Sequence, residues 1–258
     1  MLDTTLAFDH TTYLRPGPPV IALRDLVKRR EQGDSAFELR VPEFNHYAGE
    51  FVALVGESGC GKSTLLDILA LVLRPTSVGC FRLYDRNAGQ FVDVGALWLH
   101  EDQDGLARWR RELLGYVLQS GGLLPFLSVR GNIALPRRLK SGTAGDITVL
   151  AKRMNIEGLL ERKPASLSGG QRQRAAILRA IAHGPAIILA DEPTAAVDRA
   201  RARAIVADFR ALAKAADSAI IMVSHDQYLV EEFADRVFTY RLESPSPHLT
   251  VSTFLPCS

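Results

Sequence analysis

Cysteine is scarce in this chain, with three residues among 258. Cys60, Cys80 and Cys257 lack the short spacings of metal-binding motifs, and they are too few for a disulfide framework. The sequence therefore predicts neither a cysteine-ligated metal site nor a fold held by disulfides. A reducing compartment such as the cytosol is the simpler expectation.

Long apolar runs are also lacking. The longest, LLDILALVL, covers residues 65–73 and includes Asp67, whereas a membrane-spanning helix needs about 20 apolar residues. The first residues, MLDTTLAFDH, have acidic side chains and no basic segment before an apolar stretch, so we expect no signal peptide. These absences exclude a bilayer-spanning protein, but not a protein that docks on one.

An excess of charge of either sign is missing as well. The formal net charge is +2, with 31 Lys and Arg against 29 Asp and Glu, so composition favours no class of charged partner. Hydrophobic residues make up 47% of the chain, which is ordinary for a globular protein. The length suffices for one large domain or two small ones.

Short apolar runs predict the strands of a sheet. Three of them, FVALVG (51–56), AIILAD (186–191) and AIIMVS (219–224), resemble strands that are covered on both faces. Between the last two, an amphipathic pattern with Ile205 and Phe209 on one face predicts a crossover helix. This βαβ arrangement predicts an α/β fold with a parallel sheet.

The segments around this core have less regular patterns. Residues 1–19 end in RPGPP and are expected to form a flexible arm before a first strand, VIALRDL. Residues 120–180 lack strand-like runs and predict a helical lobe inserted into the core. The runs at 80–85 and 90–100 predict two strands of a hairpin, and the tail, 243–258, predicts one edge strand after a turn.

A glycine-rich turn, GESGCGKST, follows one of the apolar runs and precedes a helix expected from Lys62 to about Leu73. It fits G-x-x-x-x-G-K-[ST] in the context that this phosphate-binding loop requires. The backbone N–H groups of such a loop form a nest for phosphate, and the helix dipole adds positive potential. We expect Lys62 to reach the β- and γ-phosphates and the Ser63 hydroxyl to bind Mg²⁺. The predicted phosphate loop comprises Gly56, Glu57, Ser58, Gly59, Cys60, Gly61, Lys62, Ser63 and Thr64.

Polar side chains lie at or just after the ends of three short apolar runs. Asp191 and Glu192 end ILADE, His225 follows AIIMVS, and Gln119 ends GYVLQ. Ligands bind beyond the carboxyl ends of parallel strands, so Asp191 is expected to hold Mg²⁺ and Glu192 to polarise an attacking water. An acid pair at a strand end can also merely cap a turn, and Gln119 and His225 are weak evidence when taken alone.

A second glycine-rich turn, LSGGQ at 167–171, begins a helical run rich in Arg and Ala. Ser168 fits the N-cap position, and Gly169 and Gly170 would let a phosphate approach the backbone closely. A simple helix cap with flexible glycines explains the same residues. Physical reasoning alone leaves both alternatives open.

Taken together, GESGCGKST, Gln119, LSGGQ, ILADE and SHD, in this order and spacing, resemble the ATP-binding subunit of ABC transporters. The resemblance covers roughly residues 20–242, and it leaves 1–19 and 243–258 outside the domain. It implies a phosphate-loop ATPase core with a parallel sheet, an antiparallel β region and an inserted helical lobe. In that family two subunits pair head to tail, and ATP lies between the phosphate loop of one and the LSGGQ turn of the other.

The resemblance also implies a role for each motif, with ATP and Mg²⁺ as cofactors. Glu192 would be the general base, Gln119 and Ser63 would bind Mg²⁺ beside Asp191, and His225 would contact the γ-phosphate. Asp198, at the end of AAVD, matches a loop that couples the two sites of the dimer. The nucleotide held by the second copy would be bound by Ser168, Gly169, Gly170 and Gln171.

The implied partners are a second copy of the chain and transmembrane permease subunits, with no nucleic acid. The chain would then lie on the cytoplasmic face of the inner membrane and touch the membrane only through its partner. LADEPT, LLPFLSVRGNIALP and GLARWRRELLGYVLQ look like the branch that serves lipoprotein release and macrolide export. Arg30 stands where the family usually has an aromatic that stacks on adenine, and the role of its guanidinium stays open.

Two other functions fit the motifs less well. A soluble ABC-type ATPase acting on nucleic acid or ribosomes usually has two cassettes in tandem or a long coiled coil, and this chain has neither sustained heptads nor a basic charge excess. A regulatory module that binds ATP without turnover is disfavoured by Glu192, which is intact.

Overall fold

The computed structural model describes residues 17–140, 146–195 and 197–257, so most of the expected arm at 1–19 lies outside the described residues. Within them, ten strands form one sheet in the order β5-β4-β1-β2-β10-β9-β3-β8-β7-β6. The strands are β1 (Ile21–Gln32), β2 (Ser35–His46), β3 (Phe51–Leu54), β4 (Cys80–Asp85), β5 (Gln90–Asp93), β6 (Leu114–Val117), β7 (Ile187–Asp191), β8 (Ala219–Val223), β9 (Arg236–Ser246) and β10 (Leu249–Pro256).

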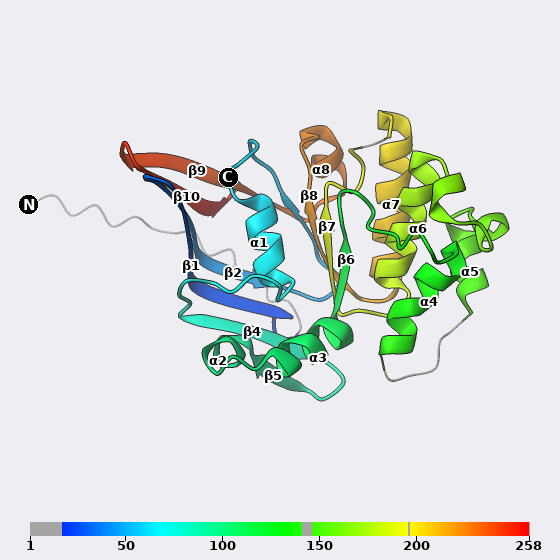
Figure 1. Ribbon diagram of the computed structural model, residues 1–258, viewed down its shortest axis with the longest axis horizontal. Helices are drawn as coiled ribbons and strands as arrows, with labels where there is room; N and C mark the ends of the chain where they lie inside the picture. Colours follow the sequence, from blue (N-terminus) through cyan, green and yellow to red (C-terminus); the bar gives the residue numbers. More distant parts are fainter. Residues whose placement is uncertain (1–16, 141–145, 196, 258) are drawn as a thin grey trace, which may run out of the picture.

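Eight α-helices accompany the sheet in the same part of the chain. They are α1 (Lys62–Leu69), α2 (Val94–Leu99), α3 (Gln103–Leu113), α4 (Val129–Leu139), α5 (Ile147–Arg153), α6 (Gly169–Ile181), α7 (Arg199–Ala215) and α8 (Gln227–Phe233). Helices lie on both sides of strands β6, β7 and β8, with α1 on one side and α6 and α7 on the other (Figure 1). The α/β class expected from the sequence is confirmed.

The parallel part of the sheet holds the motif-bearing strands. β3, β8, β7 and β6 are parallel neighbours, and α7 connects β7 to β8 as the βαβ pattern predicts. Side chains alternate along these strands, so each strand is buried on both faces. Leu189 and Ile221 pack in one core cluster with α1, whereas Ile188 and Met222 pack in a second cluster with α6 and α7. The carboxyl ends of these strands therefore share one rigid edge.

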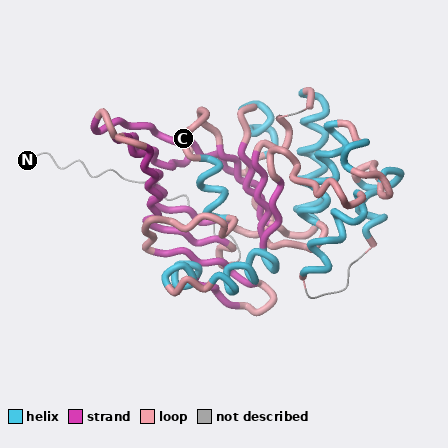
Figure 2. Tube along the Cα trace, viewed as in Figure 1, coloured by secondary structure: helices cyan, strands magenta, loops and turns pink. Residues whose placement is uncertain are grey.

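The antiparallel part of the sheet is a long hairpin extended by a second one. β1 and β2 pair along their whole length around the two-residue turn Gly33–Asp34, and β4 and β5 continue the sheet beyond β1. Figure 2 shows these strands on the side of the molecule opposite to the helices of residues 129–181. The antiparallel region that the family resemblance implies is thus present.

The helical lobe consists of α4, α5 and α6 with two short 3₁₀ turns, and it contains no strand among its described residues. Ser128 caps α4 by accepting from Gly131 N at 3.1 Å, and Asp146 caps α5 by accepting from Thr148 N at 2.8 Å. The cap residues explain why helices begin at these points in a stretch broken by glycine and proline.

Three local expectations are wrong. The helix after the phosphate loop ends at Leu69 rather than near Leu73, because Leu71 has a left-handed backbone (φ 59°) that cannot continue it. The run at 90–100 is a strand only as far as Asp93, whose side chain accepts from Ala96 N at 3.0 Å and so starts α2. A polar N-cap therefore outweighed the apolar pattern that suggested a strand.

The third wrong expectation concerns the tail. β10 is an interior strand, paired parallel with β2 and antiparallel with β9, rather than an edge strand. Its Phe254 is buried and stacks on Phe238 of β9, with ring centroids 4.6 Å apart. This burial pulls the tail into the middle of the sheet.

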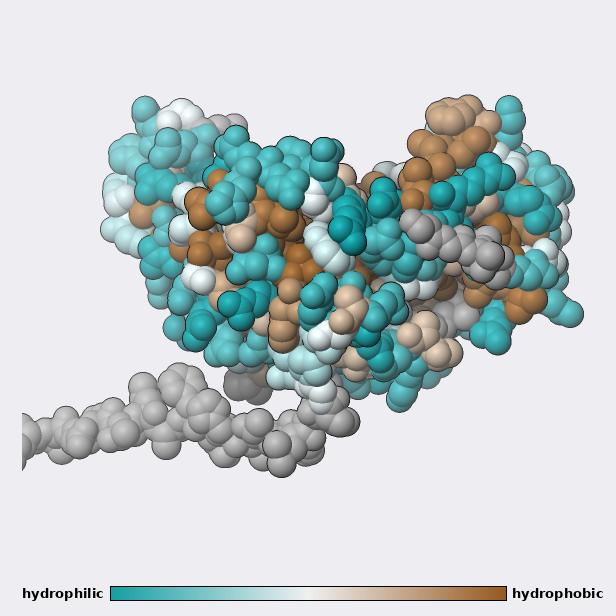
Figure 3. All heavy atoms as spheres, turned by 90° about the horizontal axis from the view of Figure 1, so that it is seen from below, coloured by the Kyte–Doolittle hydropathy of each residue, from teal (hydrophilic) through white to brown (hydrophobic). Residues whose placement is uncertain are grey.

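Seen from below, the surface is mostly hydrophilic, with hydrophobic residues showing near both ends of this face (Figure 3). The exposed large hydrophobic side chains include Leu99 on α2 and Phe126 and Leu139 in the helical lobe. No helix among the described residues is both long and apolar enough to span a membrane.

Candidate functional site

The phosphate loop leaves β3 and enters α1 at Gly61. Gly61 has φ +105°, which favours glycine, and it is the N-cap of α1 without a side-chain cap. The N–H groups of the first helical turn therefore remain available for an anion. Lys62 folds back over the loop, and its Nζ donates to the carbonyl oxygens of Gly56 and Glu57, both at 2.7 Å. A buried ammonium group at a helix N-terminus is suited to triphosphate.

Strand β10, in the C-terminal tail, supports the phosphate loop. The Ser252 hydroxyl on β10 is fully buried and donates to the Cys60 carbonyl oxygen at 2.6 Å. Cys60 is buried as well, and its Sγ lies 3.8 Å from Lys62 Nζ. The tail therefore belongs to the framework of the loop, which sequence reasoning missed because β10 follows the last motif.

The carboxyl edge of the sheet brings Glu192, Gln119 and His225 together as expected. Gln119 Nε2 donates to Glu192 Oε2 at 3.0 Å, and His225 Nε2 lies 2.5 Å from Glu192 Oε1. The Glu192 N–H donates to the carbonyl oxygen of Val223 at 3.2 Å, which fixes the residue to the end of β8. The carboxylate is thus held between an amide and an imidazole.

Asp191 lies beside the phosphate loop and is half-buried. Burial raises the pKa of Asp191, and the nearby carboxylates of Glu192 and Asp67 raise it further, whereas a hydrogen bond with Ser63 and the charge of Lys62 lower it. The Asp191 carboxylate is thus next to the Ser63 hydroxyl, and the Gln119 amide contacts the neighbouring Glu192. These are the oxygen donors that Mg²⁺ prefers, and Mg²⁺ usually takes only one or two carboxylates beside phosphate oxygens.

That donor set fits a magnesium ion shared with phosphate better than a metal held by protein alone. Among the described residues, no group of three or more His, Cys, Asp or Glu side chains is arranged to hold a metal ion.

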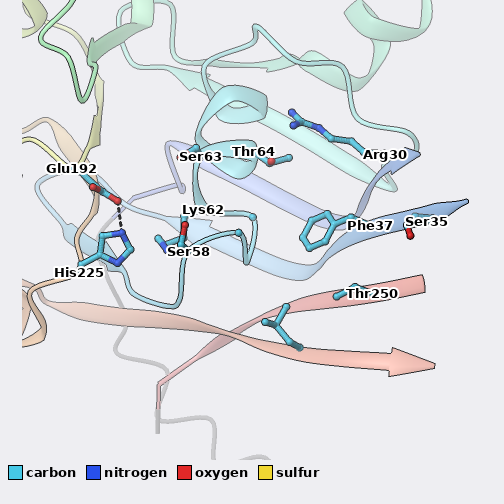
Figure 4. Close-up of a pocket in the computed structure, with 14 residues that line it drawn as sticks. Arg30, Ser35, Phe37, Ser58, Lys62, Ser63, Thr64, Glu192, His225 and Thr250 are labelled. Atoms are coloured by element: carbon cyan, nitrogen blue, oxygen red, sulfur yellow. Dashed lines mark ion pairs between the residues drawn. The ribbon is translucent and has the colours of Figure 1, made fainter. Parts of the chain in front are cut away.

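An open cavity of about 610 Å³ connects the phosphate loop with Glu192 and His225, and neither Asp191 nor Gln119 lines it (Figure 4). From the predicted site it includes Ser58, Gly59, Gly61, Lys62, Ser63, Thr64, Glu192 and His225. Glu192 and His225 lie on one side of Lys62 and Ser58, and Phe37, Ser35 and Thr250 lie on the other. The cavity is therefore elongated, with the phosphate loop near its middle.

The signature turn, residues 167–171, is not part of this cavity. Ser168 caps α6 by accepting from Gln171 N at 3.3 Å, and Gln171 Oε1 accepts from Ser168 N at 2.9 Å, which completes a capping box. Gly169 and Gly170 form the first turn of α6, in the helical lobe. The chain thus does not bring its two glycine-rich turns to one phosphate.

Asp198 lies at the start of α7. Its Oδ1 accepts from Arg201 N at 3.0 Å, and its Oδ2 lies 3.3 Å from Arg201 Nε. Within this chain Asp198 is a helix cap, and its side chain is more than half exposed. Ala196, in the same AAVD stretch, lies outside the described residues.

Sequence reasoning missed one wall of the cavity, formed by Ser35, Ala36, Phe37, Leu242 and Thr250. Phe37 could have been found from the sequence. The two-residue turn Gly33–Asp34 sets the hairpin register and places Phe37 opposite Arg30. Leu242 and Thr250 come from the pairing of β9, β10 and β2, which no local pattern specifies.

Comparison with known proteins decides the family. The model of the family described as ABC transporter matches residues 39–195. The chain is 38% identical over 231 residues to the macrolide export ATP-binding/permease protein MacB of Shigella flexneri, covering 86% of this chain and 33% of that protein. The chain belongs to the ABC transporter family. A second relative, the pyoverdine export ATP-binding/permease protein PvdT of Pseudomonas fluorescens, is 37% identical, with 81% of this chain and 31% of that protein covered.

Solved structures agree with this family. The dimeric structure of MJ0796, a bacterial ABC transporter cassette, matches with a TM-score of 0.72 and 32% identity, covering 85% of this chain and 93% of that one. A post-hydrolysis state of the same cassette, bound to ADP and Pi, matches equally well at 31% identity. The chain is an ABC-type ATPase cassette, and it spans about a third of the length of the curated relatives it matches.

Proposed function

We propose that two copies of this cassette pair head to tail around two ATP molecules and drive work through transmembrane partners. The observation that carries the proposal is that the two glycine-rich turns lie apart in one chain. Lys62 and Glu192 line the cavity, whereas Ser168 is at the start of α6 in the helical lobe. A complete site then needs the signature turn of a second copy, and the dimeric state of the MJ0796 cassette supports this pairing.

In the proposed reaction, the loop N–H groups and Lys62 hold the β- and γ-phosphates. Ser63, Gln119 and Asp191 would hold Mg²⁺, which when bound neutralises charge on the phosphate oxygens. Glu192 accepts the proton of the attacking water, and the amide N–H of Gln119 keeps one of its carboxylate oxygens oriented. His225, now paired with Glu192, would turn its ring toward the γ-phosphate once ATP is bound.

The same proposal assigns the transmembrane partner to a groove between α3, β6, α4 and α6. This groove has a volume of about 530 Å³ and is lined by Leu124, Leu135 and Leu139, with Arg110 and Arg179 at its walls. Leu139 is 59% exposed and lies with Leu124 and Leu135 in this groove, and apolar patches bordered by polar residues mark interaction sites. Relatives named as export ATP-binding/permease proteins favour an export partner, and lipoprotein release is the second candidate.

The substitution Glu192→Gln tests the proposal directly. We expect hydrolysis to fall by about 10²- to 10⁴-fold, because the base is lost, while ATP binding persists. Since the product does not form, the variant should accumulate as an ATP-bound dimer. ATPase assays and light scattering after size-exclusion chromatography measure both properties.

A matched control is Glu157→Gln, an exposed position in the helical lobe, which should keep wild-type turnover. Undiminished hydrolysis in Glu192→Gln would remove this residue from the mechanism. A variant that binds ATP yet stays monomeric at all concentrations would contradict the head-to-tail pairing.

A further inference from the structure

One face of α1 leads away from the proposed magnesium site. Ser63 and Asp67 are four residues apart in this helix, so their side chains lie on the same face, one turn from each other. Ser63 is hydrogen-bonded to Asp191, the carboxylate at the end of β7. Asp67 therefore lies one helical turn beyond the hydroxyl and the carboxylate that are expected to bind Mg²⁺.

Strand pairing brings Tyr116 to the same place. Tyr116 on β6 is paired with Leu189 on β7, and Asp191 follows Leu189 by two residues, so all three side chains lie on one face of the sheet. This is the face that α1 covers, since Leu189 packs in the core cluster that contains Leu65 and Leu69 of α1. The Tyr116 ring packs against the same cluster, so the phenol lies next to α1.

Tyr116 and Asp67 meet across this face. The Tyr116 hydroxyl donates to Asp67 Oδ1 at 3.3 Å. Burial raises the pKa of Tyr116, and the carboxylates of Asp67 and Asp191 raise it further, so both acids act on the phenol. Within the described residues, the Asp67 carboxylate accepts no other hydrogen bond. One carboxylate oxygen is thus fixed by the phenol, and the second is an acceptor beside the proposed magnesium site.

We infer that Asp67 is a positioning residue for Mg²⁺ and that Tyr116 holds its carboxylate in place. Mg²⁺ keeps several water ligands when it binds between a protein and phosphates. Groups just outside the direct ligands orient them by hydrogen bonds, and loss of such a group weakens metal binding by about 10- to 100-fold. The inference rests on the proposed function, because it takes Mg²⁺ to lie between Ser63, Asp191 and the phosphates.

A purely structural role is the alternative for the same hydrogen bond. The pair would then tie β6 to α1 and stabilise the fold without affecting a metal ion. The two roles differ in a measurable way. Loss of a structural tie lowers the midpoint of thermal unfolding, whereas loss of a positioning carboxylate lowers the advantage that Mg²⁺ gives to nucleotide binding.

The test measures ADP binding by calorimetry in Mg²⁺ and in EDTA and takes the ratio of the two affinities. By linkage, this ratio is the factor by which the protein strengthens Mg²⁺ binding to ADP. Asp67→Asn should lower the ratio by about 10-fold, with no weaker binding in EDTA. Tyr116→Phe should lower it by about 5-fold, because one hydrogen bond to the carboxylate is lost.

The two side chains should also behave as one unit. The double variant, Asp67→Asn with Tyr116→Phe, should lower the ratio no further than Asp67→Asn alone, since Tyr116 acts through that carboxylate. Asp104→Asn, an exposed position on α3, and Tyr84→Phe, on β4, are the matched controls and should keep the wild-type ratio. If Asp67→Asn fails to fold, Tyr116→Phe removes a single oxygen atom and carries the test.

The outcomes separate the inference from the function on which it rests. An unchanged ratio in either single variant, whatever its unfolding midpoint, would overturn the inference and leave the pair as a structural tie. Additive losses in the double variant would contradict the role of Tyr116. A wild-type cassette whose ADP affinity is the same in Mg²⁺ and EDTA would instead contradict the magnesium site of the proposed function.

Discussion

Glu192 has a backbone conformation that few residues other than glycine adopt. Its φ is 45°, in the left-handed region, which costs a residue with a side chain about 1–2 kcal/mol. The hydrogen bond to Val223 and the contacts with Gln119 and His225 hold it there. Strained residues of this kind concentrate at functional sites. The Glu192 side chain lines the cavity.

Glu50, just before β3, is the centre of a second charged group that is buried. It accepts from Arg236 Nε at 2.5 Å and lies 3.0 Å from Nδ1 of the buried His46. Burial alone would raise the pKa of Glu50, but the hydrogen bonds with His46 and Arg236 outweigh it and lower the pKa to about 2. The group joins the end of β2 to the start of β9. It lies at the end of β3 opposite to the phosphate loop.

We predict that this carboxylate makes stability depend on pH. Because its pKa falls from 4.5 to about 2 on folding, its contribution is complete above pH 4.5 and is lost as pH falls toward 2. The difference corresponds to about 3 kcal/mol of unfolding free energy. Urea titrations at pH 7 and pH 3 should show about 2 kcal/mol of this loss, since the remainder is lost only below pH 3.

In those titrations Glu50→Gln should destabilise the protein at pH 7 and flatten the pH dependence between the two conditions. Glu43→Gln, at an exposed position on β2, is the control and should behave as wild type. An equally steep loss of stability in the Glu50 variant would assign the pH dependence to other groups.

At the scale of elements, α6 packs on β6 through a glycine. An added Cβ at Gly115 would lie 2.2 Å from the carbonyl oxygen of Ala180, so helix and strand touch through backbone. This close contact joins the strand that leads to Gln119 with the helix that begins at the signature turn. Movement of one is therefore expected to move the other.

Gly115→Ala should force this pair apart and destabilise the protein by about 1–3 kcal/mol, as overpacking of a core does. Thermal unfolding measures the loss, and about 2–4 °C is expected for each kcal/mol at this chain length. Gly158→Ala, where nothing lies within 4 Å of the new methyl group, should leave the midpoint unchanged. Equal midpoints for both variants would show that the contact relaxes at no cost.

At the scale of the whole molecule, the two glycine-rich turns lie on different lobes of the chain. The cavity with Lys62 lies between the antiparallel strands and the carboxyl edge of the sheet, while Ser168 starts α6 in the helical lobe. If ATP is held between chains, hydrolysis depends on association, and binding of ATP to one chain does not.

We predict that Ser168→Arg lowers hydrolysis by about 100-fold or more, since donors to the γ-phosphate are worth that much, and leaves monomer affinity for ATP nearly intact. Ser166→Arg, outside the turn, is the control. Mixing Ser168→Arg with Lys62→Ala should restore part of the activity, because one site of the mixed dimer is complete. Lost monomer affinity, or no recovery on mixing, would place the turn in its own chain's site.

The phosphate loop, the strand-end acids and the crossover helix could all be located from the sequence. Each is specified locally, by a glycine where φ is positive, by a buried run of strand length, or by helical periodicity. The last residue of α1 and the start of α2 could not, because a single backbone angle at Leu71 and a cap at Asp93 decide them.

By itself, the sequence determined where the phosphate-loop motif and the strand-end side chains lie, and that these side chains meet at the carboxyl edge of a parallel sheet. Tertiary structure alone decided that β10 lies between β2 and β9, where Ser252 supports the loop and Thr250 lines the cavity beside Phe37. Pairing between strands distant in the chain depends on the burial of shared faces, such as that of Phe254, and no local pattern encodes it.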